Sequence, residues 1–397
     1  MDAVRPNGLD GVEYLPEPGE PRILTAVDPS AVQHDVGWRS NVMGWAPVEV
    51  SPLQRRRRPR NGSLVSAAVL IGLLVLIMSQ GWLVVTLPPP DAEWAFESTG
   101  LRALGDQGLD GDGVSLCVVD TGVDTSHSAL ADVNLTFLDL VERSRTPVDH
   151  GSTAHGTMMV GLLVADAHQE GAVPGVRLGV VAALAANDND ENTGDEDVVS
   201  DAIDWCVSTF EADIISLSLG GARIPGSRDL VAGAVRRALA SGVYVVAAAG
   251  NDGGPDDDGH VSSPAFVPQV IAVGASDENG TVWSSSSMGG QGDEPNEKPE
   301  VIAPGVDVIS TGFDDGWYAS SGTSVGTVLV SAALSMVLQA HPALSGLGDD
   351  RCVHEVKRSL AQSLGGVHDP RGGYGVLDAE AWSASIDAGC ADTTVLN

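Results

Sequence analysis

The feature that most constrains the fold is an alternation between short apolar runs, rich in Val, Ile and Ala, and segments with helical spacing. Each apolar run leads directly into a turn that contains glycine or polar residues. This alternation predicts right-handed βαβ units and an α/β fold with a mostly parallel central sheet and helices on both faces. The runs lie in residues 114–119, 213–220 and 243–251, and residues 229–241 have helical spacing.

A serine stands at the start of another predicted helix. Residues 325–340 form a long run of small and apolar side chains that ends before Pro342, which predicts a buried helix. Ser324 belongs to its N-terminal turn. Backbone N–H groups at a helix N-terminus favour negative charge, so a serine there is well placed as a nucleophile whose oxyanion product is stabilised. The turn by itself is also typical of a simple helix cap.

Two other polar residues occupy positions where α/β folds place their chemistry. Asp120 follows the first apolar run, and the carboxyl ends of parallel strands form the usual functional edge of such a sheet. The alternative is an aspartate that only forms a turn. His155 stands at the head of an apolar helix, where the alternative is a structural histidine. Neither position decides between these alternatives alone.

The net charge limits the partners of the chain. Its 397 residues contain 54 Asp and Glu against 21 Lys and Arg, which gives a formal charge of −33. This charge excludes nucleic acid as an expected partner and disfavours an anionic membrane surface for the soluble part. A surface so acidic and so poor in lysine is typical of proteins kept soluble in concentrated salt, where screening reduces self-repulsion. A base bias of the genome is the competing explanation.

The first 90 residues predict a membrane segment. Residues 1–62 are rich in Pro, Gly and acidic residues and end in the arginine cluster 55–60, and we expect them to be disordered and cytoplasmic. Residues 63–87 contain an uncharged apolar run that reaches about 36 Å as a helix, enough to span a bilayer. We expect an uncleaved signal-anchor with everything beyond it outside. A cleaved export signal, which would release the protein, is the alternative. The remainder divides into a linker at 88–100, a folded domain at 101–390 and a tail at 391–397.

Four short motifs occur in the order Asp, His, Asn, Ser, each at an expected strand or helix end. With them the chain resembles the subtilisin-like serine proteases, the subtilase family, over about residues 101–382. The resemblance implies a subtilisin-like three-layer fold and a serine endopeptidase that acts on polypeptides, which we expect to be monomeric. The four motifs are Asp120-Thr121-Gly122, His155-Gly156-Thr157, Ala249-Gly250-Asn251 and Gly322-Thr323-Ser324.

The same resemblance implies a role for each motif. Ser324 would attack the scissile carbonyl, His155 would move the proton, and Asp120 would orient the imidazole. Asn251 would donate its side-chain amide to the oxyanion. Residues 184–186 and the segment Ser218, Leu219 and Gly220 would present backbone edges to an extended peptide. A roomy, uncharged pocket for the side chain before the cut would be formed by Ala248, Ala249, Gly250 and Ser262, with residues 256–258 as solvated surface.

The chain also departs from the family pattern. After the serine, Val325-Gly326-Thr327 lacks the usual proline and histidine, and Met158 stands where a second histidine is common. A catalytically silent, peptide-binding subtilase domain at the cell surface is therefore the alternative function. An aspartic protease would need a second Asp-Thr-Gly motif or a dimer, and no second motif follows in the sequence.

No cofactor is required by this chemistry, and no His or Cys spacing indicates zinc. Calcium is a frequent structural ion in the resembled family. The acidic run at 188–197 offers oxygen ligands for a structural calcium ion, with a solvated loop as the alternative. Cys352 and Cys390 are candidates for a disulfide, whereas Cys117 and Cys206 are expected to be buried small residues without one.

Overall fold

The computed structural model describes residues 23–26 and 91–386, apart from residues 168, 223–227, 256, 291–296 and 346–349. A seven-stranded sheet forms its centre, and every neighbouring pair in it is parallel. The strand order is β11-β10-β9-β7-β2-β4-β3. These strands are β2 (Ser115–Asp120), β3 (Leu135–Asp139), β4 (Arg177–Ala182), β7 (Ile214–Leu217), β9 (Tyr244–Ala248), β10 (Ile271–Ser276) and β11 (Val301–Pro304).

Strand order reverses at β2, which pairs with β4 on one side and with β7 on the other. After β2 the chain forms β3 at the edge of the sheet and then β4 between β3 and β2, before it crosses to add β7, β9, β10 and β11. In an open parallel sheet, the carboxyl end of the strand at such a reversal borders a crevice between the two halves. Asp120 is the last residue of β2, so it lies at this crevice.

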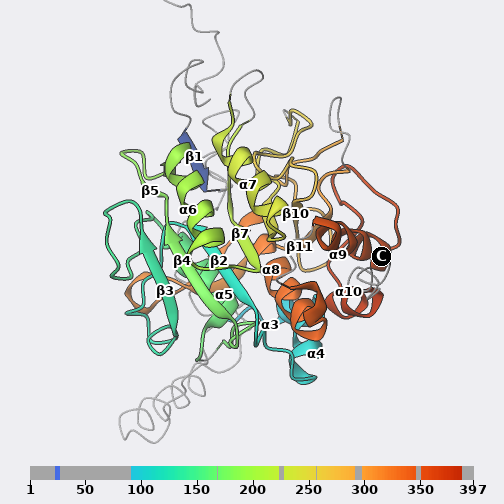
Figure 1. Cartoon of the computed structure of the whole chain (residues 1–397), viewed down its shortest axis with the longest axis horizontal. Coiled ribbons are helices and arrows are strands. Elements are labelled where there is room, and N and C mark those ends of the chain that lie inside the picture. Colours follow the sequence, from blue (N-terminus) through green and yellow to red (C-terminus); the bar gives the residue numbers. More distant parts are fainter. Residues whose placement is uncertain are drawn as a thin grey trace, which may run out of the picture.

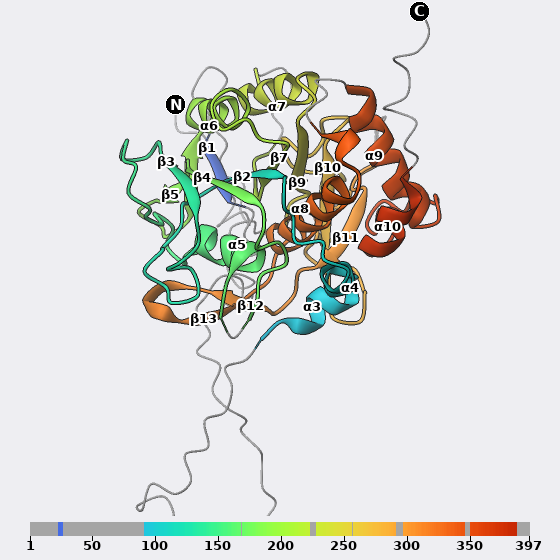
Figure 2. The same ribbon diagram turned by 60° about the horizontal axis from the view of Figure 1, so that its bottom comes forward.

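Helices cover both faces of the sheet, as Figures 1 and 2 show. On one face α6 (Glu196–Ser208) packs beside α7 (Leu230–Ala240), and on the other α5 (His155–Val164) packs against α8 (Thr323–Ala340). The side chain of Asp229 caps α7 by accepting from the N–H of Ala232. This arrangement confirms the predicted α/β fold with a mostly parallel sheet.

Shorter elements close the domain at its edges. Helices α3 (Glu93–Ser98) and α4 (Leu101–Asp106) precede the sheet, and α9 (Asp350–Ser363) and α10 (Ala379–Ser385) follow α8. The strands β12 (Val308–Thr311) and β13 (Trp317–Ser320) form an antiparallel pair, and two 3₁₀ turns lie at Phe313–Asp315 and Pro342–Leu344. The prediction of a linker at 88–100 was wrong for α3, because Ala95 and Phe96 are fully buried in the core.

A second, small sheet has the order β5-β6-β1-β8. It consists of β5 (Ala185–Ala186), β6 (Asn192–Asp195), β1 (Ile23–Ala26) and β8 (Leu219–Gly220). The prediction that the first 62 residues have no structure was therefore wrong for residues 23–26, which pair with both β6 and β8. The reason is that this strand draws its partners from segments about 170 to 195 residues away, so local composition could not indicate it.

The predicted membrane segment at 63–87 lies outside the described residues, as does the tail at 391–397. Within the described part, α8 alone has the length and composition to span a membrane. It is 89% buried inside the fold, and the core helix of a globular domain passes the same test. The length and composition of α8 are therefore no evidence that this helix spans a membrane.

Disulfide pairing corrects the sequence prediction. Cys117 in β2 and Cys206 in α6 are both buried as expected, but they are joined to each other across 89 residues. The helix α6 packs on the face of the sheet that contains β2, which brings the two side chains together. Cys352 is disulfide-bonded as well, and its expected partner Cys390 lies outside the described residues.

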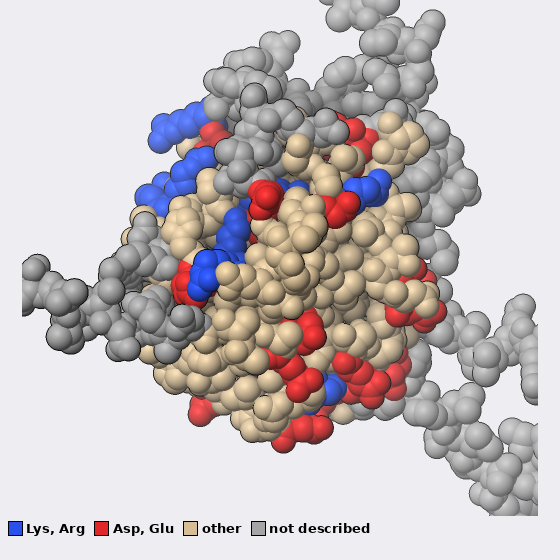
Figure 3. All heavy atoms as spheres, turned by 90° about the vertical axis from the view of Figure 1, so that its right-hand side faces the viewer, with Lys and Arg blue, Asp and Glu red and all other residues tan. Residues whose placement is uncertain are grey.

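Charge is distributed unevenly over the surface. On the face shown in Figure 3, which carries α9 and α10, acidic side chains are scattered while basic ones gather toward one side. Both lysines of the chain bind the same carboxylate, that of Glu300, which is buried. Lys298 is itself fully buried and donates to the carbonyl of Val270 at 2.5 Å. This cluster joins the segment before β11 to α9 through a buried carboxylate.

Candidate active site

Four predicted residues come from four strand or helix ends at one edge of the sheet. Asp120 ends β2, and Asn251 follows the end of β9 by three residues. His155 begins α5 and Ser324 is the second residue of α8, and these two helices pack against each other. All four side chains are fully buried.

Asp120 and His155 are joined directly. The Nδ1 atom of His155 lies 2.5 Å from Oδ1 of Asp120, and both side chains have no solvent exposure. The same carboxylate oxygen accepts from the backbone N–H of Thr121 at 2.7 Å. These contacts orient the imidazole, because an ionised carboxylate accepts the Nδ1 proton and leaves Nε2 for proton transfer.

Glycines explain how the two motifs approach so closely. A Cβ atom on Gly156 would lie 2.1 Å from the carbonyl oxygen of Gly122, and one on Gly122 would lie 2.0 Å from that of Val148. Gly122 also has a φ of 115°, which disfavours any other residue. The N–H of Gly156 donates to the Thr121 hydroxyl at 2.9 Å. The motif glycines thus let the N-terminus of α5 contact the turn after Asp120.

Ser324 lies in the first turn of α8, where the predicted helix begins even without a proline. Its hydroxyl donates to the carbonyl of Ser218 at 3.2 Å, and the Ser218 hydroxyl donates to the carbonyl of Ser324 at 3.0 Å. This reciprocal pair ties the serine to the strand end after β7. Gly326 in the altered segment packs closely, because a Cβ there would lie 2.9 Å from the carbonyl oxygen of Gly274.

Asn251 is fixed by the same helix end. Its Oδ1 atom accepts from both the N–H and the hydroxyl of Thr323, each at 3.0 Å. With the oxygen so engaged, the amide nitrogen Nδ2 has no hydrogen-bond acceptor among the described residues. A buried N–H donor without an acceptor costs free energy unless another group satisfies it, so this atom is suited to an incoming anion.

The residues predicted for a side-chain pocket lie together. The N–H of Ser262 donates to the carbonyl of Ala249 at 2.7 Å. A Cβ on Gly250 would lie 2.5 Å from the Ser262 hydroxyl and 2.4 Å from that of Ser287, so only glycine leaves space here. Ala248 ends β9 and is buried. Sequence reasoning missed Ser287, for which no local motif gave a signal.

An aspartate beside Asn251 has an unusual titration. Burial raises the pKa of Asp252 to about 6; the hydrogen bond from Ser287 lowers it, and the nearby carboxylates of Asp258 and Asp257 raise it. Burial also raises the pKa of Asp257, against hydrogen bonds from the N–H groups of Gly259 and Met288. The site therefore has a weakly acidic rim close to neutral pH.

The backbone edges for an extended peptide differ in part from the prediction. Leu219 and Gly220 form β8, as expected of an edge beside Ser218. Residues 185–186 instead pair with β6, and β6 in turn pairs with β1, which lies between β6 and β8. Gly194 in β6 is required there, because a Cβ would lie 2.4 Å from the carbonyl oxygen of Ala183. Sequence reasoning missed β6 because it lies within the acidic run.

The calcium site predicted for residues 188–197 stays a prediction, and several oxygens in and beside that run already accept hydrogen bonds. The side-chain oxygen of Asn187 accepts from the N–H groups of Asn189 and Glu191, and that of Asn192 accepts from Ser152. The carboxylate of Glu196 is buried and accepts from the N–H of Leu230. These oxygens already serve as turn and helix acceptors. No group of three or more His, Cys, Asp or Glu among the described residues is arranged to hold a metal ion.

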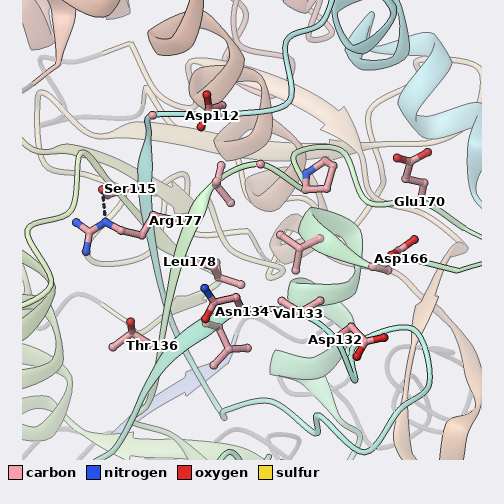
Figure 4. Close-up of a pocket in the computed structure, with 17 residues that line it drawn as sticks. Asp112, Ser115, Asp132, Val133, Asn134, Thr136, Asp166, Glu170, Arg177 and Leu178 are labelled. Carbon is pink, nitrogen blue, oxygen red and sulfur yellow. Dashed lines mark hydrogen bonds between the residues drawn. The ribbon is translucent and has the colours of Figure 1, made fainter.

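A pocket lies at the opposite edge of the sheet. It has a volume of about 900 Å³ and is bordered by the amino ends of β2, β3 and β4 (Figure 4). It is far in the fold from Asp120, which lies at the carboxyl end of β2. The carboxylates around it belong to Asp112, Asp132, Asp166 and Glu170.

Comparison with known proteins agrees with this geometry. The profile of the Subtilase family matches residues 111–375. Subtilisin DY of Bacillus licheniformis is 31% identical over 279 residues, which cover 69% of this chain and 92% of that protein. Subtilisin amylosacchariticus of Bacillus subtilis subsp. amylosacchariticus is 33% identical over 244 residues, 60% of this chain and 59% of that protein. Serine protease AprX of Bacillus subtilis (strain 168) is 30% identical over 271 residues, 60% of each chain.

The matches cover different shares of the relatives. The chain spans about three fifths of the length of the first relatives that it matches, and nearly all of Subtilisin DY. The family profile covers more than half of the chain and includes all four motifs. This membership also replaces the aspartic-protease interpretation of the Asp-Thr-Gly motif. The protein belongs to the Subtilase family.

Proposed function

We propose that the protein is a serine endopeptidase that uses Asp120, His155 and Ser324 as a triad. The observation that carries this proposal is the 2.5 Å contact between Nδ1 of His155 and Oδ1 of Asp120, in a fully buried site. Such a pair has one effective use in a family of serine peptidases, which is to prepare Nε2 as a general base. The packing of α5 against α8 supports Ser324 as the group that it activates.

The reaction follows from these positions. Ser324 Oγ attacks the scissile carbonyl while His155 takes the hydroxyl proton and then gives it to the leaving amine. Asp120 keeps the imidazole in one tautomer and stabilises its charged form. The oxyanion accepts from Nδ2 of Asn251 and from the N–H of Ser324. Water then hydrolyses the acyl-enzyme by the same proton route, which restores the hydroxyl of Ser324.

Substrate recognition rests on backbone edges and small side chains. An extended peptide adds a strand between β6 and β8, and its main chain then leads toward Ser324. Ala249, Gly250 and Ser262 leave a space that admits a side chain without a matching charge. No cofactor enters this chemistry, and we propose that the protein works as a monomer on polypeptides, without nucleic acid.

Membrane attachment completes the proposal. The arginine cluster and the apolar run at 63–87 favour a single-span anchor with residues 1–62 in the cytoplasm and the catalytic domain outside. Release after signal cleavage is the alternative location. The formal charge of −33 favours work in concentrated salt, where self-repulsion is screened.

Labelling with a fluorophosphonate probe tests the proposal, because the probe reacts only with an activated serine. Wild type should label and Ser324→Ala should not, at low or at molar salt. Labelling only at molar salt would support the salt adaptation too. If circular dichroism shows that the wild type is folded and it labels at neither salt concentration, the peptide-binding alternative is favoured.

A further inference from the structure

The hairpin of β12 and β13, residues 308–320, leads directly to the proposed nucleophile. Its two strands are antiparallel, and the N–H of Gly322 donates to the carbonyl of Gly305 at 2.7 Å, which closes its base. Ser324 follows Gly322 by two residues and lies in the first turn of α8. The base of the hairpin and the start of α8 are therefore held together.

One strand of the hairpin is bound to α5, the helix that begins with His155. The hydroxyl of Ser310 donates to the carbonyl of Met158 at 2.6 Å. The hydroxyl of Thr311 donates to the carbonyl of Thr157 at 2.8 Å, and these side chains are all buried. Figure 2 shows the hairpin beside α5, in agreement with the contacts between β12 and that helix. The hairpin thus holds the first turns of α5.

The tip of the hairpin is bound to the segment that follows Asp120. His127 is fully buried, and its Nε2 donates to the carbonyl of Gly316 at 3.1 Å. The N–H of Ser128 donates to the carboxylate of Asp315 at 2.7 Å. The hairpin therefore contacts the segment after the proposed aspartate, the helix of the proposed base and the turn of the proposed nucleophile.

Two other residues fix the position of β12. A Cβ on Gly161 of α5 would lie 2.2 Å from the hydroxyl of Thr311, so only glycine lets the strand come this close. Gln169 is buried in the loop after α5, where its Oε1 accepts from the N–H of Ala92 and its Nε2 donates to the carbonyl of Ile309, each at 2.9 Å. The strand β12 is therefore held both by α5 and by the loop that follows this helix.

We propose that the hairpin of β12 and β13 is a positioning element for the triad, with Ser310 and Thr311 as its positioning residues. This inference rests on the proposed function of the site. Neither hydroxyl takes part in the reaction. Each acts through α5, by keeping the imidazole of His155 within reach of the serine that follows the hairpin. A displacement of about 1 Å far from the chemistry can lower a rate by about 10², so the loss of one such contact should be measurable.

Peptide hydrolysis by full-length protein provides the test. Thr311→Val keeps the shape of the side chain but removes its hydroxyl, and Thr311→Ser keeps the hydroxyl. We expect Thr311→Val to lower kcat by about tenfold with KM within about twofold of wild type, because the peptide-binding edges lie on other strands. Thr311→Ser should stay within about twofold of wild type in both constants.

Ser335→Ala is the matched control. It also removes a buried hydroxyl, but one that donates to the carbonyl of Ser331 within α8 itself, at 2.9 Å. It should leave kcat unchanged. Ser310→Ala provides the same test if Thr311→Val does not fold. A wild-type kcat in Thr311→Val, or an equal loss in Thr311→Ser or Ser335→Ala, would overturn the proposal.

Hydrogen exchange separates this inference from the proposed catalysis. In full-length Ser324→Ala, adding Thr311→Val should speed amide exchange in α5, and adding Thr311→Ser should not. This measurement needs no activity, so it tests the hold of the hairpin on α5 even if wild type cleaves no peptide. Equal exchange in α5 with Thr311→Val and with Thr311→Ser would contradict the positioning role.

Discussion

The two ends of β2 differ in what surrounds them. At its carboxyl end Asp120 is fully buried, bound to His155, and enclosed by glycines that leave no space. At its amino end Ser115 borders the pocket of about 900 Å³, which is lined by four acidic residues and by Arg177. The comparison teaches that convergent donors and acceptors, rather than the volume of a cavity, distinguish the proposed site in this fold.

The largest difference between the two ends of β2 should appear in kcat when one carboxylate is neutralised at each end. Asp120→Asn should lower kcat by about 10⁴, because the imidazole loses the partner that sets its tautomer. Asp112→Asn, at the amino end, should change kcat by less than about twofold. Peptide hydrolysis, with unfolding midpoints as a check on the fold, measures both. Equal losses in the two variants would mean that the buried pair has no catalytic role.

A smaller effect should come from the proposed oxyanion donor, Asn251. Asn251→Ala should lower kcat by about 10²–10³ with little change in KM, because the donor acts on charge that develops in the transition state. Asn251→Asp is the informative companion, since it keeps the acceptor for Thr323 but loses Nδ2. A loss confined to KM would show that Asn251 binds the substrate instead.

The acidic rim at the carboxyl end should affect the free energy of unfolding rather than the reaction rate. The pKa of Asp252 is raised to about 6, so the folded state holds this proton to higher pH than the unfolded chain. Ionisation therefore destabilises the fold as the pH rises from about 4 to about 6, and the loss persists above that range. Asp252→Asn should unfold with a higher free energy than wild type near about pH 8, by at most about 3 kcal/mol. The two proteins should be similar near about pH 3, as denaturant titrations would show.

The smallest effect is expected at the amino-end pocket. Replacing Asp132 and Asp166 together with Asn should raise the unfolding midpoint slightly in low salt, by about 1 °C or less, because it relieves repulsion between exposed charges. The shift should disappear in molar salt. Calorimetry at both salt concentrations measures it, and a fall in peptidase rate would assign the pocket a part in the reaction.

Local motifs allowed most of the site to be predicted, and nonlocal pairing explains the rest. Asp120, His155 and Ser324 each stand at the end of a segment whose own pattern marks it as strand or helix. The strand β6 was hidden because its partners, residues 185–186 and 23–26, are set by register across the chain. The bond between Cys117 and Cys206 was missed for the same reason, since a separation of 89 residues leaves no local pattern.

Packing accounts for another part of what the sequence could not reveal. The sequence after Ser324 departs from the family pattern, which raised the alternative of a silent domain. In the structure, Gly326 packs against the backbone of Gly274, and α8 begins at the expected turn. The helix α3 was assigned to a linker because six residues are too few for a periodic signal. Its burial depends on the partners that the fold provides.

The shared carboxylate of Glu300 makes the folded domain unreactive toward amine chemistry. Lys298 is fully buried and the side chain of Lys357 is only 20% exposed, and the chain has no other lysine. Acylating reagents and lysine-directed proteases should thus react slowly with both lysines while Lys357 of α9 stays paired with Glu300. Once that contact opens, both amines become available together. The rate of lysine acylation therefore reports the opening of one defined region, without any label having to be introduced.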